Sequence, residues 1–124
     1  MKFTLLRGLF AICKANSDST MPDWASTGGF CSVTRTTDEL TVICEEAAVP
    51  SHVQAERGFI CMKLQGPFDF QAIGILESFL GPLANAGVPI FAISTFDTDY
   101  ILVRQEFWGE AFNCLQRAGH ELVP

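Results

Sequence analysis

The chain has 124 residues, of which 48% are hydrophobic and 18% are charged, and its formal net charge is −6. These proportions are typical of a folded protein and exclude a disordered chain. The eight lysines and arginines are scattered along the sequence, whereas nucleic-acid binding requires clustered cations. We therefore expect one compact domain or two half-sized lobes, with no nucleic-acid partner.

The chain begins with an apolar segment, MKFTLLRGLFAICKA. Arg7 interrupts this segment and no clean small-residue cleavage site follows it, so we expect a strand rather than a signal peptide. No apolar run is long enough to span a bilayer, and we expect no membrane partner. The five cysteines form no CxxC motif, and their odd number favours a reduced, cytoplasmic compartment over a disulfide framework.

The N-terminal half alternates strand-like runs with polar segments. The expected elements, in chain order, are one strand Phe3–Lys14 or two strands broken at Gly8, a polar turn region Asn16–Thr27 with room for a helical turn at Pro22–Ala25, strands Phe30–Thr36 and Glu39–Glu45, and a connector Ala47–Gly58. The two middle strands predict a hairpin that turns at Thr37 and Asp38.

The C-terminal half predicts a regular succession of elements. In chain order they are strand Phe59–Leu64, helix Asp69–Ala86, strands Pro89–Thr95 and Tyr100–Gln105, helix Trp108–Ala118 and strand His120–Val123. Pro82 lies inside the first predicted helix and should kink it or end it early. The order β-α-β-β-α-β is the ferredoxin-like arrangement, so the predicted fold class is α+β.

A polar insert, STFDTD, separates the two strands in the middle of this half. Its acceptor side chains, which suit an ammonium or guanidinium group, are Ser94, Thr95, Asp97, Thr98 and Asp99. We expect the insert to lie beside the start of the first helix, where free backbone N–H groups and Gly74 favour a ligand carboxylate. Phe96 offers an apolar wall. The site would suit a zwitterionic amino acid, although the same residues can instead bond their own backbone in a turn.

The two halves share a short pattern. Without gaps, VTRTTDELTVI aligns with ISTFDTDYILV, which suggests two related β-α-β-like lobes and places Arg35 opposite Thr95. Arg35 is a candidate either for a surface salt bridge or for binding a carboxylate.

Signals for catalysis, cofactors and metals are weak. The chain contains no GxGxxG or GxxxxGK[ST] loop and no Asp-x-Asp-x-Asp-Gly calcium loop. The cysteines lie in apolar, strand-like or helical surroundings, which predicts buried, inert thiols. We expect no enzyme activity, no cofactor and no metal site.

The motifs WASTGGFCSVTRTTDELTVIC, ERGF, GPFDF, PLANAGVPIFAISTFDTDYILV and RAGHELV resemble a bacterial family of small ACT-domain proteins. The stretch ISTFDTDYILV is also similar to the ACT domains of animal cytosolic arginine sensors and of aspartate kinases. The resemblance implies two ferredoxin-like ACT lobes packed as one unit, residues 1–58 and 59–124, which bind a small effector and have no catalytic activity.

The same resemblance implies specific ligand-binding positions. In the sensors the ligand lies between lobes, and the matching positions here are Gly74, Ile75, Thr95, Phe96, Asp97 and Asp99. The sensors have more lobes than this chain, so a complete pocket would require self-association, and a homodimer is expected.

Two functions therefore remain open. The first is an amino-acid-binding regulatory or sensor protein. The second is a structural or interaction module that oligomerises through its ACT lobes and binds no ligand, because unpaired sheet edges with few lysines favour association.

Overall fold

The computed structural model describes residues 1–124, and the chain divides into two compact units. Residues Met1–Arg7 and Ile60–Pro124 form one, which we call the discontinuous unit, and Gly8–Phe59 form the other, the inserted unit. This division differs from the predicted 1–58 and 59–124 in two respects. The first seven residues join the second unit, because their strand pairs with strands there, and the internal boundary lies after Phe59. Whether each unit is an ACT lobe stays a prediction.

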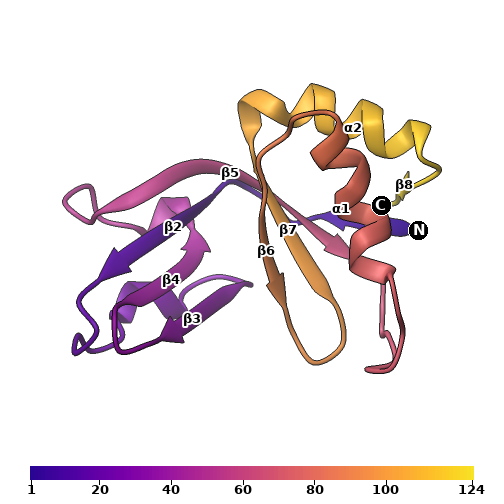
Figure 1. The fold of residues 1–124 in the computed structure, drawn as a ribbon. Coiled ribbons are helices and arrows are strands. Elements are labelled where there is room, and N and C mark those ends of the chain that lie inside the picture. Colours follow the sequence, from indigo (N-terminus) through magenta and orange to yellow (C-terminus); the bar gives the residue numbers. More distant parts are fainter. The chain divides into compact units, whose positions relative to one another are not determined.

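The elements follow one another as shown in Figure 1. In chain order they are β1 (Lys2–Leu5), β2 (Phe10–Ala15), η1 (Asp23–Ser26), β3 (Cys31–Arg35), β4 (Leu40–Glu45), η2 (Glu46–Ala48), β5 (Ala55–Leu64), α1 (Ile75–Asn85), β6 (Phe91–Ser94), β7 (Asp99–Arg104), η3 (Gln105–Phe107), α2 (Trp108–Arg117) and β8 (Glu121–Leu122), where η marks a 3-10 helix.

The discontinuous unit contains a ferredoxin-like α+β arrangement, as predicted. Its strands lie in the order β6-β7-β5-β1-β8, and both α-helices pack on one face of them (Figure 1). Strand β1 is antiparallel to β5, with Phe3 opposite Leu64, and parallel to β8, with Phe3 opposite Leu122. The N-terminal strand thus separates β5 from β8. None of the helices has both the length and the apolar character needed to cross a membrane.

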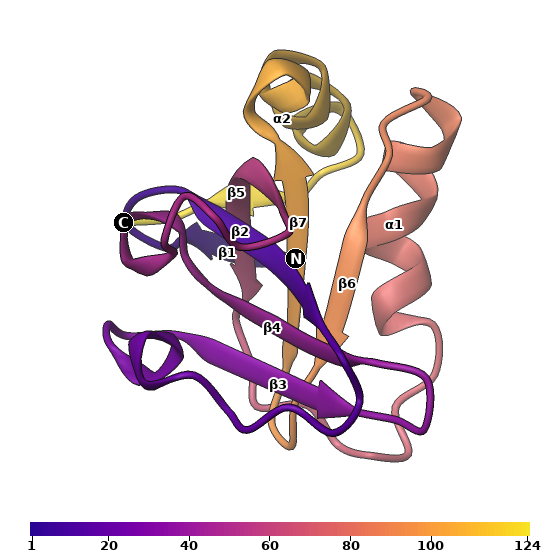
Figure 2. The same cartoon turned by 90° about the vertical axis from the view of Figure 1, so that its left-hand side faces the viewer.

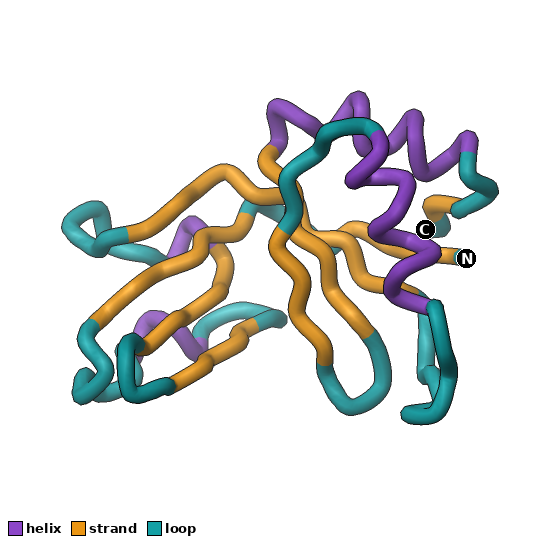
Figure 3. The backbone as a smooth tube through the Cα atoms, in the orientation of Figure 1, coloured by secondary structure: helices purple, strands orange, loops and turns teal.

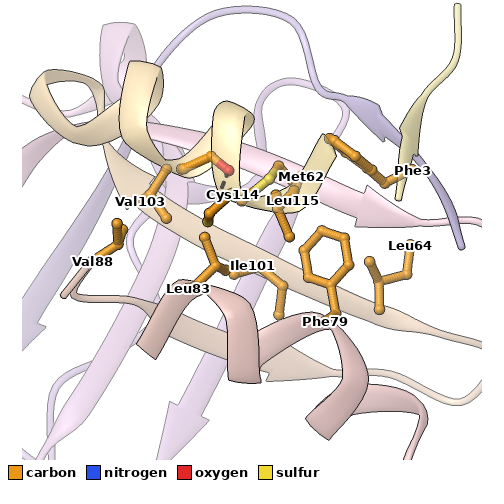
Figure 4. Close-up of a cluster of buried hydrophobic side chains, with 11 residues drawn as sticks. Phe3, Met62, Leu64, Phe79, Leu83, Val88, Ile101, Val103, Cys114 and Leu115 are labelled. Carbon is orange, nitrogen blue, oxygen red and sulfur yellow. Dashed lines mark hydrogen bonds between the residues drawn. The ribbon is translucent and has the colours of Figure 1, made fainter. Parts of the chain in front are cut away.

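One hydrophobic core joins the helices to the strands of this unit (Figure 4). Its buried members are Phe3, Met62, Leu64, Phe79, Leu83, Val88, Ile101, Val103, Ala111, Cys114 and Leu115. Helix α1 presents Phe79 and Leu83 at a spacing of four residues, and β7 presents Ile101 and Val103 at a spacing of two, as the two periodicities require. The Phe3 and Phe79 rings meet edge to face, with centroids 5.3 Å apart.

The inserted unit consists of strands and 3-10 turns. Its strands lie in the order β3-β4-β2-β5, of which β5 contributes only its first half. Figure 2 shows β3 and β4 side by side, joined by a tight turn. A separate core contains Ala11, Cys13, Ala25, Leu40, Val42, Cys44 and Val49. The polar region Asn16–Thr27 forms only the single turn η1, so this unit has no α-helix.

Several predicted boundaries are wrong for identifiable reasons. Strand β5 begins at Ala55 rather than Phe59, because residues 55 and 56 pair with β2. Helix α1 begins at Ile75 rather than Asp69, because Gly74 has a φ of 79° and interrupts the helical conformation. In contrast, one of the two alternatives for the N-terminal apolar segment is confirmed: it forms two strands, with Gly8 at a φ of 83° between them. The last strand contains only Glu121 and Leu122.

Pro82 does not end α1 early, which was one of the two predicted outcomes, since the helix continues to Asn85. The other outcome, a kink, stays a prediction. Proline at this position removes one intrahelical hydrogen bond, the bond to the carbonyl of Ser78. Another donor, His120, lies close to that carbonyl, and the cost of the proline is thereby reduced.

Candidate functional site

A pocket of about 400 Å³ lies in the discontinuous unit between the start of α1 and the β6–β7 hairpin. Its lining residues are Phe68, Asp69, Phe70, Ala72, Gly74, Ile75, Leu76, Glu77, Ser94, Thr95, Phe96, Asp97, Thr98 and Asp99. Every site residue predicted from the sequence, apart from Arg35, borders this one pocket. The loops that contribute to the lining are drawn in teal in Figure 3, at the end of the β6–β7 hairpin and before α1.

The polar insert folds as a tight hairpin end. Strand β6 ends at Ser94 and β7 begins at Asp99, and the backbone N–H of Thr95 donates to the carbonyl of Thr98 over 2.8 Å. The Thr95 hydroxyl donates to the same carbonyl over 3.1 Å. No residue other than glycine has a positive φ, so this turn is not of type I′, which needs positive φ at both central residues. The absence of glycine from the insert therefore has a structural reason.

The hairpin end is hydrogen-bonded to the last residue of β5 and to the chain that follows it. Thr98, which is 7% exposed, donates its hydroxyl to the carbonyl of Leu64 over 2.7 Å. The N–H of Phe68 donates to the carbonyl of Asp97 over 2.8 Å. A Cβ at Gly66 would lie 2.7 Å from that same carbonyl oxygen, so only glycine permits this approach. The hydroxyls of Thr95 and Thr98 thus donate hydrogen bonds to backbone carbonyls, which is one of the two roles predicted from the sequence.

All charged side chains that line the pocket are acidic. Asp69, Glu77, Asp97 and Asp99 all contribute to its lining, and no lysine, arginine or histidine does. Oδ1 of Asp99 accepts a hydrogen bond of 2.5 Å from the Ser94 hydroxyl. Four carboxylates around one volume favour a cation, and they do so more strongly than the two predicted from the sequence.

The opposite wall is the first turn of α1. Gly74 precedes the helix in the left-handed region, no side chain caps the helix, and the N–H of Ser78 makes a helical bond to the Gly74 carbonyl. The N–H groups before Ser78 have no helical acceptor, as at any helix start. A Cβ at Gly74 would meet nothing within 4 Å. The positive φ explains this glycine, and the predicted close approach of a ligand carboxylate to it stays a prediction.

Two aromatic rings lie at the edge of the pocket. The centroids of Phe70 and Phe96 are 4.7 Å apart, and these side chains are 73% and 79% exposed. The neighbouring Ile73 is 97% exposed. Phe70, Ile73 and Phe96 thus form a group of exposed apolar side chains at the edge of the pocket.

Six lining residues were missed by the sequence interpretation: Phe68, Asp69, Phe70, Ala72, Leu76 and Glu77. Asp69 and Phe70 belong to the GPFDF motif that carried part of the family resemblance. The motif was read as the beginning of a helix, and its side chains were therefore not considered as lining for a site.

Arg35 lies in the inserted unit, where its guanidinium donates to the backbone carbonyls of Ser17 and Ser19, the latter over 2.7 Å. These bonds take the place of the predicted surface salt bridge, and Arg35 does not border the pocket of the discontinuous unit. The alignment that led to Arg35 is also wrong by one residue. The N–H of Thr36 donates to the carbonyl of Glu39 as that of Thr95 does to Thr98, so Thr36, not Arg35, corresponds to Thr95.

The cysteines only partly agree with the prediction of buried thiols. All five are free, four are buried, and Cys31 is exposed. Burial raises the pKa of Cys44 and of Cys61 to about 12. No group of three histidine, cysteine or acidic side chains is arranged to hold a metal ion.

Comparison with known proteins identifies the family. A model of the ACT domain matches residues 54–117, just over half of the chain. The chain belongs to the ACT-domain family. A second family model, which describes an N-terminal domain, matches residues 8–52.

Solved structures agree with this ACT-domain assignment. Protein Atu0741 from Agobacterium tumefaciens is 40% identical, with a TM-score of 0.93 over 98% of this chain and 91% of that chain. Protein VC0802 from Vibrio cholerae is 21% identical, with a TM-score of 0.75 over 94% and 88%. The regulatory subunit of aspartate kinase from Thermus thermophilus is 10% identical, with a TM-score of 0.59 over 90% and 93%, which shows a shared fold. No curated protein matches the sequence significantly.

Proposed function

We propose that this ACT-domain protein binds a small effector with a cationic group, an amino acid foremost, in the pocket between α1 and the β6–β7 hairpin. It would act as a regulatory or sensor protein without catalytic activity. The observation that carries the proposal is that two segments distant in sequence, 74–77 and 94–99, border one pocket of about 400 Å³. This volume lies in the range of pockets that hold small molecules.

The charges of the lining support one orientation of the proposed ligand. An ammonium or guanidinium group would lie against the carboxylates of Asp97 and Asp99, because charge-assisted bonds are stronger than neutral ones. A carboxylate would face the N–H groups of the first turn of α1, where the helix dipole favours negative charge. The ring of Phe96 would cover the aliphatic part of the ligand.

The comparisons support a regulatory role through fold alone. One protein with this fold is described as the regulatory subunit of aspartate kinase, and another as an aspartate kinase that is an allosteric enzyme. Both are only 10% identical to this chain. The ligand and the regulated partner must therefore come from experiment.

Thermal unfolding in the presence of each of the twenty amino acids tests the proposal. A true ligand at a hundredfold excess over its dissociation constant stabilises the native state by about 2.7 kcal/mol. The variant Asp97→Asn should lose most of this stabilisation. The matched control is Asp38→Asn, because Asp38 occupies the corresponding position in the β3–β4 hairpin, between Thr36 and Glu39. No stabilisation by any amino acid, or equal losses in both variants, would contradict the proposal.

A homodimer is the second proposal, and the exposed apolar surface beside the pocket favours it. Strand β6 pairs only with β7, so its other edge is open, and Phe91 on it is 37% exposed. Phe70, Ile73 and Phe96 are exposed on the adjoining loops. Light scattering after size-exclusion chromatography should give twice the mass of 13.6 kDa. A monomer at every concentration would refute the dimer but would leave the ligand proposal intact.

A further inference from the structure

Three cysteines of the inserted unit lie on adjacent strands. Cys31 on β3 is opposite Cys44 on β4, and Cys44 is opposite Ala11 on β2, two residues before Cys13. The Cys13 and Cys31 thiols both lie close enough to Cys44 to raise its pKa. Residues that face each other across antiparallel strands project to the same side of a sheet. The sulfur of Cys44 therefore has a thiol neighbour on each side.

The pairing pattern places Cys31 and Cys44 close together. Thr36 and Glu39 form a hydrogen-bonded pair, since the N–H of Thr36 donates to the carbonyl of Glu39. Hydrogen-bonded and non-hydrogen-bonded pairs alternate along antiparallel strands. The register is continuous from Arg35–Leu40 to Cys31–Cys44. Cys31–Cys44 is the fifth pair after Thr36–Glu39, so it is a non-hydrogen-bonded pair. Such pairs have Cα atoms about 4.5 Å apart, and disulfides need roughly 4.4–6.8 Å.

The two thiols differ in access. Cys31 is exposed and is the first residue of β3, which pairs with β4 alone and so forms an edge of the unit. Cys44 is fully buried in the core of the unit. A reagent in solution thus reaches Cys31 first, and Cys44 is the neighbour that can react with the modified sulfur.

We propose that Cys31 and Cys44 are a site of reversible oxidation by hydrogen peroxide, which converts them into a cross-strand disulfide. The Cys31 thiolate attacks one peroxide oxygen and breaks the O–O bond, which gives a sulfenic acid and releases hydroxide. The Cys44 sulfur then attacks the Cys31 sulfur, a second hydroxide leaves, and the two thiol protons convert both hydroxides into water. The two sulfurs lose two electrons in total, and the peroxide gains them.

The acidity of the thiols sets the speed of this oxidation. Burial raises the pKa of Cys31, and burial together with the neighbouring Cys13 and Cys31 thiols raises that of Cys44 to about 12. The thiolate is the reactive species. The rate should therefore be slow at neutral pH and rise about tenfold per pH unit while the pH stays below the thiol pKa.

Hydrogen peroxide and mass spectrometry test the site on the full chain. The reduced protein is treated with peroxide at pH 8, its remaining thiols are alkylated under denaturing conditions, and it is digested with trypsin. All five cysteines fall in different tryptic peptides, because a lysine or arginine separates each from the next. The expected product is a bridge between peptides 15–35 and 36–57, which dithiothreitol cleaves.

Two variants accompany this experiment. Cys31→Ser should abolish the bridge. Because Cys31 is exposed, this variant should fold as the native sequence does. Cys114→Ser is the matched control, because a serine hydroxyl can keep the bond that the Cys114 thiol donates to the carbonyl of Ala111, and the bridge should form unchanged. A bridge between peptides 8–14 and 36–57, or only irreversible oxidation of Cys31, would overturn the proposal.

Discussion

Nε2 of His120 lies 2.9 Å from the carbonyl oxygen of Ser78, the oxygen that Pro82 leaves without a helical donor. A carbonyl oxygen can only accept, so Nε2 carries the proton of the imidazole. The ring packs against Phe79 at a centroid distance of 5.0 Å, and its Nδ1 is buried without a partner. Helix α1 and the residue before β8 are thus joined through one polar contact in the core.

Replacement of His120 should cost less when Pro82 is also replaced. His120→Phe keeps an aromatic ring against Phe79 but leaves the Ser78 carbonyl unsatisfied, which should cost about 1–3 kcal/mol. In a Pro82→Ala background the restored N–H serves that carbonyl, and the loss should fall to less than half. Urea unfolding of the four proteins in this double-mutant cycle measures the coupling. His52→Phe, at an exposed position, is the control, and strictly additive losses would contradict the coupling.

Thr98→Val should loosen the hairpin that borders the pocket. Valine preserves the shape of threonine but removes the donor to the Leu64 carbonyl, which should cost about 1–2 kcal/mol at this buried position. Thr95→Val removes a more exposed bond within the same turn and should cost less. Guanidinium unfolding compares the two variants, and equal losses would show that the link to β5 contributes little.

Glycines 66, 74 and 87 should respond to alanine for different reasons. At Gly66 the new Cβ would lie 2.7 Å from a backbone oxygen of Asp97, which cannot move without the hairpin, and a loss of about 1–3 kcal/mol is expected. Gly74 and Gly87 have φ values of 79° and 73° with open space around them. Each should lose about 1–2 kcal/mol through backbone strain.

Ligand binding separates the last two glycines. Gly74→Ala should also weaken the response to an effector, because Gly74 borders the pocket, whereas Gly87→Ala should not. Thermal unfolding with and without the effector measures both quantities. Equal ligand responses in the two variants would argue against the pocket as the binding site.

The stability of the protein should fall as the pH rises above 9. Burial raises the pKa of the Cys61 thiol from 9.0 to about 12, so the unfolded chain releases this proton in a range where the native protein keeps it. The native state then binds more protons, and the free energy of unfolding decreases by up to about 1.4 kcal/mol per pH unit between 9 and 12. Cys61→Ala should show a shallower decrease than the native sequence in urea unfolding at pH 9 to 11. An unchanged slope would contradict the assignment to Cys61.

The residues of the candidate site were predictable where local chemistry determined their position. The polar insert stands between two apolar strands, so it could be placed at a strand end from the sequence. Gly74, in contrast, was predicted inside the helix Asp69–Ala86, and its position before the first helical residue came from the structure. The loop 65–74 has no periodicity of its own. Its position depends on the bonds that Asp97 and Thr98 make with it and with Leu64. Asp69 and Phe70 could not be assigned to the site without these long-range contacts.

Arg35 and β1 show two other limits of sequence interpretation. The gapless alignment of the two halves was wrong by one residue. It therefore matched Arg35 with Thr95, although Thr36 is the residue that corresponds to Thr95. The placement of β1 depends on pairing with β5 and β8, which no local pattern specifies. The strand itself was correctly predicted, while its partners were not.

Because β1 pairs with β5 and β8, the Gly8–Phe59 segment is an insertion in the sequence of the discontinuous unit and not an N-terminal extension of it. A fragment that starts at residue 59 would lack β1, an interior strand of the sheet, and the Phe3 ring of the core. Removal of the inserted unit, Gly8–Phe59, is the better route to a minimal protein. The N–H of Leu6 donates to the carbonyl of Cys61 over 2.9 Å, so the two cut ends are neighbours, and a two-residue glycine-containing turn should reconnect them.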